Sequence, residues 1–316
     1  MDGRRPHRRP APVGRPGQGK VRATRRSIRS HRDRDRCVVG GWTRCRAVGV
    51  SSTGHDALAI VSFSFSDSSL RPVGYQRWRN LLFIHWPVPA AALRRLVPRQ
   101  LDLDLYDGQA YLSLVPFLVA ESRPRGIPRA LATRFLETNL RTYVRAADGE
   151  AGIYFFSLDA SSLLAVSAAR LLYGLPYFPA VMSVRTEGPR TEYSSRRQGA
   201  RDAQLDVDWV VGASVGSAPV GTRDHFLIER YNLYVRRGGA IYRGRVRHRP
   251  YPLREVTVEQ LSETLLGAAG LPAPIDSPVY HHSPGVDVDI FWLERIGLRE
   301  PHRVSVDVLS RRRAMN

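Results

Sequence analysis

Short apolar segments joined by tight turns fill most of this chain, and they constrain its fold more than any other feature. Leucine and aspartate alternate along 101–105, just before an Asp107-Gly108 turn, and Gly238-Gly239 separates two further segments. An apolar residue at every second position is typical of a half-buried strand, and Asp-Gly or Gly-Gly between two such segments predicts a hairpin. The sequence therefore predicts a mainly β fold of antiparallel strands.

Helical patterns are few. We expect one helix over 90–97, a buried apolar helix over 161–173, and a third that begins at the capping-box pair Thr257 and Gln260 and ends near Gly270. Strands and helices do not alternate as in a parallel α/β sheet, so a closed or strongly curved antiparallel sheet with about three helices is expected. The expected strands cover 81–86, 101–105, 111–119, 138–145, 153–158, 177–186, 191–196, 205–211, 231–235, 241–246 and 286–296.

The first 72 residues are basic and differ in composition from the rest. Residues 1–50 contain 15 of the 48 Lys and Arg residues and only three acids, together with many Pro, Gly and Ser, which is typical of a disordered segment. We expect a disordered extension over 1–72, a single domain over 73–300 and a basic tail over 301–316. The extension either binds nucleic acid electrostatically or is an unstructured addition, including an artefact of start-site assignment. Nucleic acid is expected as a partner only through this extension.

Membrane insertion and disulfide formation have little support in the sequence. The longest apolar region, 153–172, is interrupted by Asp159 and Arg170, which makes it too polar for a membrane span. Both cysteines, Cys37 and Cys45, fall in the extension. We expect a soluble, cytoplasmic protein without a membrane partner, and the sequence leaves open whether it forms a homo-oligomer.

Lysine is almost absent from the chain. Lys20, in the extension, is the single lysine among 48 Lys and Arg residues. Arginine keeps its charge and is a poor nucleophile, whereas a desolvated lysine can act as a nucleophile or a base. The predicted domain therefore cannot form a Schiff base through a lysine side chain.

Two motifs suggest chemistry but lack the context that the chemistry needs. The segment 212–216 matches the nucleophile-elbow pattern around Ser214, yet residues 217–221 do not predict the helix that an elbow requires. A serine hydrolase at Ser214 is therefore the weakest alternative. His281 and His282 would point to opposite faces of a strand, and no closely spaced ligand set accompanies them, so we expect no metal and no cofactor.

The hairpin that contains residues 138–158 carries polar side chains with the spacing of a site. Glu137, Asn139 and Arg141 share one face of the first strand, and Ser157 and Asp159 of the returning strand can complete that face. Arg141 is the candidate clamp for a ligand carboxylate, and Glu137 or Asp159 is the candidate acid or base. The same spacing fits an ion-paired outer face of the sheet equally well.

A second group of candidate ligand-binding residues follows later in the chain. Arg230, Tyr231 and His248 can complete the wall of a pocket for a small acidic ligand, or they can pack as cation–π pairs on a β surface. The whole arginine–tyrosine group consists of Arg230, Tyr231, Tyr234, Tyr242, Arg243, Arg245, His248 and Tyr251.

Several of these segments resemble the YqjF-like family of uncharacterised bacterial proteins. The similar segments are WRNLLFIHWPVP (78–89), ETNLRTYV (137–144), FFSLDA (155–160), YGLPY (173–177), ERY (229–231) and YRG (242–244). The resemblance covers roughly residues 75–297. It implies the acetoacetate decarboxylase-like fold, a closed, mostly antiparallel β-barrel with flanking helices and a central cavity.

The resemblance and the lysine content together define the expected function. The decarboxylase that gives the fold its name uses a desolvated lysine, with a second lysine beside it, to form a Schiff base with a β-keto acid. The predicted domain has neither lysine. We therefore expect a protein that binds or turns over a small carboxylate or keto compound without Schiff-base chemistry. Any enzymatic activity would be that of a non-covalent acid/base lyase or a related enzyme.

Overall fold

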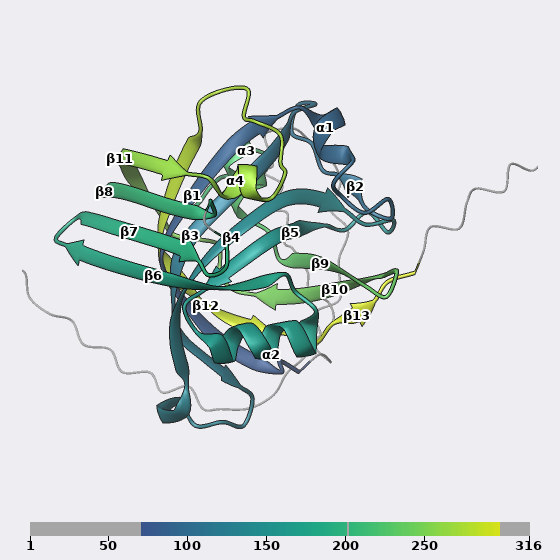
Figure 1. Cartoon of the computed structure of the whole chain (residues 1–316), viewed down its shortest axis with the longest axis horizontal. Helices are drawn as coiled ribbons and strands as arrows, with labels where there is room; N and C mark the ends of the chain where they lie inside the picture. The colour runs from purple at the N-terminus through teal and green to yellow at the C-terminus, as the bar shows by residue number, and fades with distance from the viewer. Residues whose placement is uncertain (1–70, 201, 298–316) are drawn as a thin grey trace, which may run out of the picture. The chain divides into compact units, whose positions relative to one another are not determined.

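Strands dominate the computed structural model of the protein, which describes residues 71–200 and 202–297 (Figure 1). The described residues fall in the compact unit Ser64–Asn316. The strands are β1 (Gly74–Val88), β2 (Asp102–Leu103), β3 (Ala110–Pro124), β4 (Thr133–Arg145), β5 (Ala151–Ala160), β6 (Tyr177–Glu187), β7 (Arg190–Arg197), β8 (Gln204–Gly216), β9 (Asn232–Arg237), β10 (Ala240–Arg247), β11 (Leu253–Glu263), β12 (Val279–Ile290) and β13 (Glu294–Arg295). The helices described with them are α1 (Ala90–Arg94), α2 (Leu163–Tyr173), α3 (Arg223–Ile228), α4 (Leu265–Ala268) and the 3₁₀ helix η1 (Arg129–Leu131). The prediction of a mainly β fold is confirmed.

All these strands belong to one hydrogen-bonded sheet. Their order is β13-β10-β9-β5-β6-β7-β8-β11-β12-β1-β3-β4-β2, with additional pairings of β10 with β12 and of β5 with β4. The pairs are antiparallel except β5 with β6 and β5 with β9. Figure 1 shows β6, β7, β8 and β11 extending together to one side of the molecule.

The central strands are buried on both faces. Along β1, Leu81 and Phe83 belong to one hydrophobic cluster, while Leu82 and Ile84 belong to a second. The first cluster contains side chains of α3, and the second contains side chains of β8 and α4. A strand covered on both faces has a continuous apolar sequence instead of an alternating one, which explains the run over 81–86.

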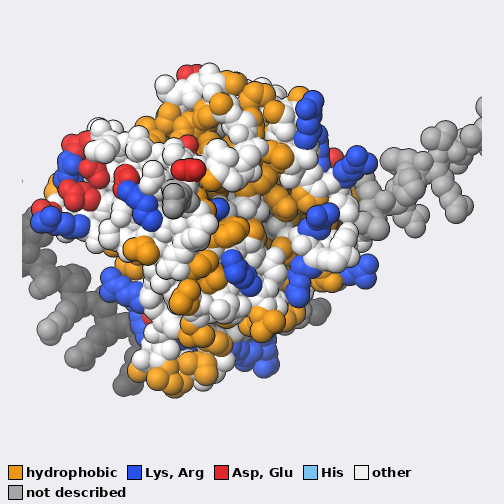
Figure 2. All heavy atoms as spheres, viewed as in Figure 1, with side chains coloured by type: hydrophobic (Ala, Val, Ile, Leu, Met, Phe, Trp, Pro, Cys, Tyr) orange, Lys and Arg blue, Asp and Glu red, His pale blue; other side chains and the backbone are white. Residues whose placement is uncertain are grey.

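Helix α2 is more exposed to solvent than the sequence predicts. Its N-terminus is capped by Ser162, whose hydroxyl accepts a hydrogen bond from the Ala165 amide, and it ends at Gly174 in the left-handed conformation. Val166 is its buried residue, whereas Leu164 is 69% exposed and Leu171 is 79% exposed. The expectation of a buried helix is therefore wrong. Figure 2 shows hydrophobic side chains gathered on the face of the molecule that carries α2.

The capping-box prediction is also wrong. Thr257 and Gln260 lie in β11, which pairs with β8 from Leu253 to Glu263. This long pairing overrides the local helix signal, because strand pairing and side-chain packing outweigh a cap worth about 1 kcal/mol. The helix that does form there, α4, is one turn long and begins after Thr264.

The first predicted hairpin forms only in part. Asp107 and Gly108 adopt positive φ angles of 48° and 76°, as the predicted turn requires. The preceding strand β2 is two residues long, however, and it pairs with β4 instead of β3. The second and third predicted hairpins, β4–β5 and β9–β10, are confirmed.

Gly152 of β5 allows β9 to approach closely. A Cβ atom at this position would lie 2.6 Å from the Asn232 carbonyl oxygen and 2.7 Å from the Tyr234 ring. We expect Gly152→Ala to lower the free energy of unfolding by about 2 kcal/mol, because the backbone must move to relieve the overlap. Urea denaturation measures this change, and Gly149→Ala is unsuitable as a control because Gly149 has a φ of 87°. Gly267→Ala, in helix α4, where a Cβ meets no atom within 4 Å, is the matched control and should not lower the free energy of unfolding, because alanine is favoured over glycine in a helix.

Two sequence predictions concern residues beyond the described part. The basic extension and the C-terminal tail fall almost entirely on 1–70 and 298–316, outside the described residues, so both stay predictions. Over 71–200 and 202–297, no helix is long and apolar enough to cross a membrane.

Candidate functional site

A β-bulge divides the polar face that the sequence predicts. Leu140 of β4 lies opposite Ser157 of β5, whereas Arg141 lies opposite Phe155, so Phe156 is an extra residue on β5. Directly opposite residues of an antiparallel pair share a face, and a bulge therefore reverses the alternation beyond it. Ser157 and Arg141 lie on opposite faces of the sheet, and the prediction of one shared face is wrong.

Asp159 lies with Ser157 on the second face, opposite Thr138. Its Oδ1 atom accepts a hydrogen bond from Arg197 Nε at 2.9 Å, and both side chains of this ion pair are buried. Arg197 also lies over the Phe178 ring, with its Cζ atom 4.1 Å from the centroid. Burial raises the pKa of Asp159, and the charge of Arg197 opposes that shift. The sheet thus separates Asp159 from Arg141, and Asp159 has an arginine partner of its own.

Arg141 is a buried cation without a carboxylate partner. The residue is 7% exposed, and it takes part in none of the ion pairs between described residues. Its Nε and Nη2 atoms have no hydrogen-bond partner in the described part of the chain. Its Cζ atom lies 5.7 Å from the centroid of the Phe83 ring, a cation–π contact that offsets only part of the cost of desolvation.

Arg141 belongs to a row of polar residues that crosses three neighbouring strands. Ser113 of β3 lies opposite both His85 of β1 and Arg141 of β4, so the three share a face. We call them the Arg141 row. Neighbouring strands are about 4.8 Å apart, which separates the Cα atoms of His85 and Arg141 by about 10 Å. The Tyr143 hydroxyl, next on the same face, lies 2.9 Å from His85 Nδ1 and donates to the Leu227 carbonyl at 2.8 Å.

His85 is not among the site residues that the sequence predicts. The sequence signal that could have found His85 is a single imidazole within an apolar run. A buried polar side chain is expected to have hydrogen-bond partners, so this histidine predicts a polar group inside the fold. His85 is 0% exposed. Burial, followed by the positive charges of His281, Arg141 and Arg223, holds the pKa of His85 well below its ordinary value. The imidazole is therefore neutral near pH 7.

Glu137 lies on the same face of β4 as Arg141 and is 5% exposed. The two residues are four positions apart along the strand, so their Cα atoms are about 13 Å apart. The Tyr177 hydroxyl donates to Glu137 Oε2 at 2.8 Å. Burial raises the pKa of Glu137 to about 7, while hydrogen bonds from Tyr177 and Asn139 oppose the shift. This carboxyl can hold or release a proton near neutral pH, as a general acid or base must. Asn139, between the two, is buried and its Oδ1 atom has no partner among the described residues.

Arg230, Tyr231 and His248 lie on the side of the sheet that carries the Arg141 row. Arg230 Cζ is 5.1 Å from the Tyr143 ring centroid, and its Nη1 atom is 3.0 Å from Asp104 Oδ2. The Tyr231 and His248 rings have centroids 4.7 Å apart. Arg230 is thus already ion-paired through Nη1, although its Nε and Nη2 atoms have no hydrogen-bond partner in the described structure. The buried Nε2 atom of His248 has no hydrogen-bond partner there either.

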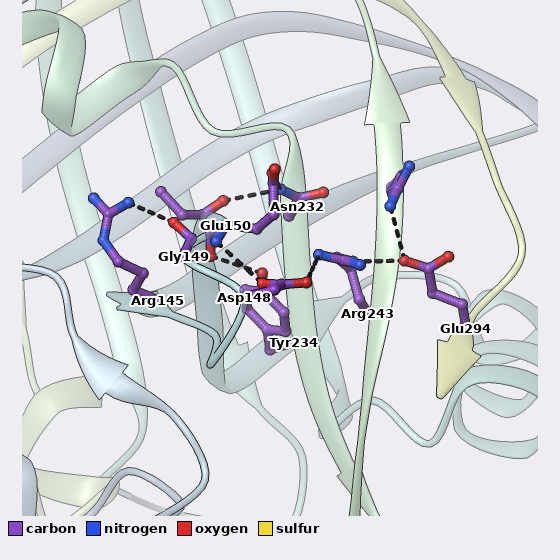
Figure 3. A network of polar contacts seen from close by, with 10 residues as sticks. Arg145, Asp148, Gly149, Glu150, Asn232, Tyr234, Arg243 and Glu294 are labelled. Atoms are coloured by element: carbon purple, nitrogen blue, oxygen red, sulfur yellow. Dashed lines mark hydrogen bonds and ion pairs between the residues drawn. The ribbon is translucent and has the colours of Figure 1, made fainter. Parts of the chain in front are cut away.

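Other members of the arginine–tyrosine group hold the β4–β5 turn in place (Figure 3). Arg243 donates from Nη1 to Asp148 Oδ2 at 2.8 Å and from Nε to Glu294 Oε1 at 2.6 Å. The Tyr234 hydroxyl donates to the Glu150 carbonyl at 2.8 Å. These contacts connect the turn to β9, β10 and β13, so the packing interpretation fits Tyr234 and Arg243.

Two surface pockets, each of about 430 Å³, lie near the Arg141 row. The wall of the first includes Asp224, whose Oδ1 atom is 3.2 Å from His281 Nε2. The His281 ring centroid is in turn 5.4 Å from that of His85. The wall of the second includes His248. Arg141 lines neither pocket.

The remaining motifs have other structural roles. Ser214 is exposed within β8, opposite Arg254 of β11, whereas an elbow holds its serine on a sharp turn before a helix. This geometry does not support the hydrolase alternative. His282 meets Asn80 on the face of β12 opposite to His281, with 2.8 Å between Nε2 and Oδ1. Within the described ranges, no group of three or more His, Cys, Asp and Glu side chains could hold a metal ion.

The fold is that of solved structures of the acetoacetate decarboxylase type. The enduracididine biosynthesis enzyme MppR complexed with pyruvate has a TM-score of 0.51 and 14% identity, covering 77% of this chain and 98% of its own. A structure of acetoacetate decarboxylase has a TM-score of 0.51 and 14% identity, covering 76% of this chain and 96% of its own. At this identity the similarity shows an acetoacetate decarboxylase-like fold.

The sequence comparison defines the family. DUF2071, a family of uncharacterized conserved proteins, matches residues 75–287. The uncharacterized protein YqjF of Bacillus subtilis (strain 168) is 38% identical over 218 residues, which cover 69% of this chain and 89% of that protein. The chain belongs to the DUF2071 family, and its resemblance to the YqjF-like proteins is confirmed.

Proposed function

We propose that the protein binds a small carboxylate or keto acid at the Arg141 row, without forming a Schiff base. The observation that carries this proposal is the buried Arg141 guanidinium, which has two donor atoms without partners and no carboxylate beside it. A ligand carboxylate would accept two parallel hydrogen bonds from such a guanidinium.

The free-energy cost of burying an unpaired charge supports a ligand beside Arg141. Burying a charge costs several kcal/mol unless a partner compensates it. Arg230 shows the usual solution, because its side chain is only 7% exposed and lies against the carboxylate of Asp104. Arg141 lacks such a partner within the described chain. An arginine that stabilised the fold alone would be expected to have one.

The chemistry available on the face of the sheet that carries the row is that of acids and bases. Residues 71–297 contain no lysine, so no side-chain amine can form a covalent intermediate with a keto acid there. Glu137, whose pKa is about 7, and the neutral imidazole of His85 are the groups that can exchange protons. Turnover would make the protein an acid/base lyase or a related enzyme.

The strand pairing supports an enclosed site. From β5 the order runs through β6, β7, β8, β11, β12, β1 and β3 to β4, and β4 pairs again with β5. A set of strands that returns to its start supports the closed barrel that the resemblance implies. MppR, which has a similar fold, is complexed with pyruvate, a small 2-oxo acid.

Isothermal titration calorimetry with pyruvate, acetoacetate and benzoate tests the proposal. We expect at least one acid to bind with a Kd between about 1 μM and 1 mM, and its methyl ester to bind at least about tenfold more weakly because it lacks the charge. Arg141→Gln should abolish this binding. Arg185→Gln is the matched control, because Arg185 is an exposed arginine that is paired with Glu187 and lines neither pocket, and it should leave the Kd unchanged. Equal binding of acid and ester, or an unchanged Kd in Arg141→Gln, would contradict the proposal.

A further inference from the structure

The hydrogen bonds of Tyr143 determine which nitrogen of His85 carries the proton. The Tyr143 hydroxyl has one proton, and the Leu227 carbonyl at 2.8 Å can only accept it. His85 Nδ1, 2.9 Å from the same hydroxyl oxygen, must then be the donor of the second hydrogen bond. Both contacts are satisfied only when His85 is protonated at Nδ1.

The Nε2 atom of His85 is therefore unprotonated and can accept a hydrogen bond. A neutral imidazole has a lone pair on the nitrogen that carries no proton. His85 Nε2 is buried and has no hydrogen-bond partner in the described part of the protein, and the residue is 0% exposed. A buried acceptor without a donor is unfavourable, because it has lost its hydrogen bonds to water. The same face thus contains an acceptor without a donor, on His85, and donors without an acceptor, on Arg141.

We propose that His85 Nε2 accepts a hydrogen bond from a hydroxyl group of the ligand whose carboxylate Arg141 binds. This inference rests on the proposed function and narrows its ligand class to small hydroxy carboxylates and the enol forms of keto acids. A ketone oxygen has no proton to donate and leaves Nε2 unsatisfied, whereas a hydroxyl or enol group satisfies it.

The dimensions of the row fit a small ligand. The Cα atoms of His85 and Arg141 are about 10 Å apart across two strand spacings, and both side chains extend from the same face, with Ser113 between them. A hydroxyl group one or two carbon atoms from the carboxylate is compatible with this spacing. The pocket beside Asp224 is connected to the row through side-chain contacts, because Asp224 contacts His281 and the His281 ring contacts that of His85.

Two matched pairs of acids test the inference. L-lactate and propionate differ only in a hydroxyl group, as do 3-hydroxybutyrate and butyrate. We expect the wild-type protein to bind one hydroxy acid of these pairs about tenfold more tightly than its counterpart. In His85→Phe, which keeps a flat ring but loses the acceptor, this ratio should fall below about twofold while the Kd of the unsubstituted acid is retained.

A second measurement does not depend on finding the ligand or on the folding of His85→Phe. Long-range ¹H–¹⁵N NMR spectra of the wild-type protein should show His85 as the neutral tautomer protonated at Nδ1, and Tyr143→Phe should weaken that preference. A His85 protonated at Nε2 would overturn the inference, because Nε2 would then be a donor.

The outcomes separate the two proposals. If hydroxy and unsubstituted acids bind equally and Arg141→Met abolishes both, the role of His85 is refuted and the proposed function stands. If none of the four acids binds, and pyruvate, acetoacetate and benzoate do not bind either, the proposed function fails and the inference fails with it.

Discussion

Replacing Arg141 with methionine is expected to raise the free energy of unfolding of the ligand-free protein by about 1–4 kcal/mol. Methionine has a similar length, fills the same space beside Phe83, and removes a charge that has no carboxylate partner in the described structure. Residues kept for ligand binding commonly reduce stability, and their replacement by apolar residues recovers it. Urea denaturation without added carboxylates measures the effect.

Arg230→Met is the matched control for this prediction, and it should have the opposite sign. Arg230 is also buried, but its Nη1 atom lies 3.0 Å from Asp104 Oδ2. The substitution leaves Asp104 with Arg145 as its partner, so we expect a loss of about 2 kcal/mol. If Arg141→Met destabilises the protein as much as Arg230→Met does, Arg141 is a structural residue. Its lack of a carboxylate partner would then not support a ligand site.

The second large effect is a pH dependence of stability that arises from Glu137. Its pKa is about 7 in the folded protein, against an ordinary value of 4.5, because burial disfavours the carboxylate. The folded state therefore holds the proton more tightly than the unfolded state. The resulting stabilisation is fully present below pH 4.5 and is lost as the pH rises through 7. The difference corresponds to about 3 kcal/mol.

Glu137→Gln isolates this contribution, because glutamine keeps the shape of the protonated carboxyl group and does not titrate. The wild-type free energy of unfolding minus that of Glu137→Gln should fall by about 3 kcal/mol between pH 4 and pH 8.5. Buried histidines such as His85 and His248 also titrate, but their contributions are common to both proteins and cancel in the difference. A difference that is constant with pH, or that rises with pH, would show that Glu137 is ionised in the folded protein at neutral pH.

The local patterns that predict strands and hairpins account for most of the sheet. The continuous apolar run over 81–86, the polar alternation in β4 and the Gly238-Gly239 turn are each confirmed. The helix prediction at Thr257 failed because a cap signature is local, whereas the pairing of β11 with β8 depends on residues about fifty positions earlier. A short local signal cannot outweigh a partner strand that the sequence does not reveal.

The candidate site was predicted in part, and the failures have physical causes. Spacing by two places Glu137, Asn139 and Arg141 on one face of β4, and the structure agrees for these three. The bulge at Phe156 has no sequence signal such as a glycine, so the assignment of Ser157 to that face was wrong. His85 and Ser113 join Arg141 only through the register of three strands, which spacing along one strand cannot show.

A crystal structure of the protein with the tightest-binding small carboxylate is the most direct test of the central claim. We expect the carboxylate oxygens to lie within about 2.7–3.2 Å of the Arg141 guanidinium nitrogens. A hydroxyl group of the ligand should lie within the same distance of His85 Nε2. A carboxylate bound elsewhere, with Arg141 Nε and Nη2 still without an anionic partner, would contradict the claim.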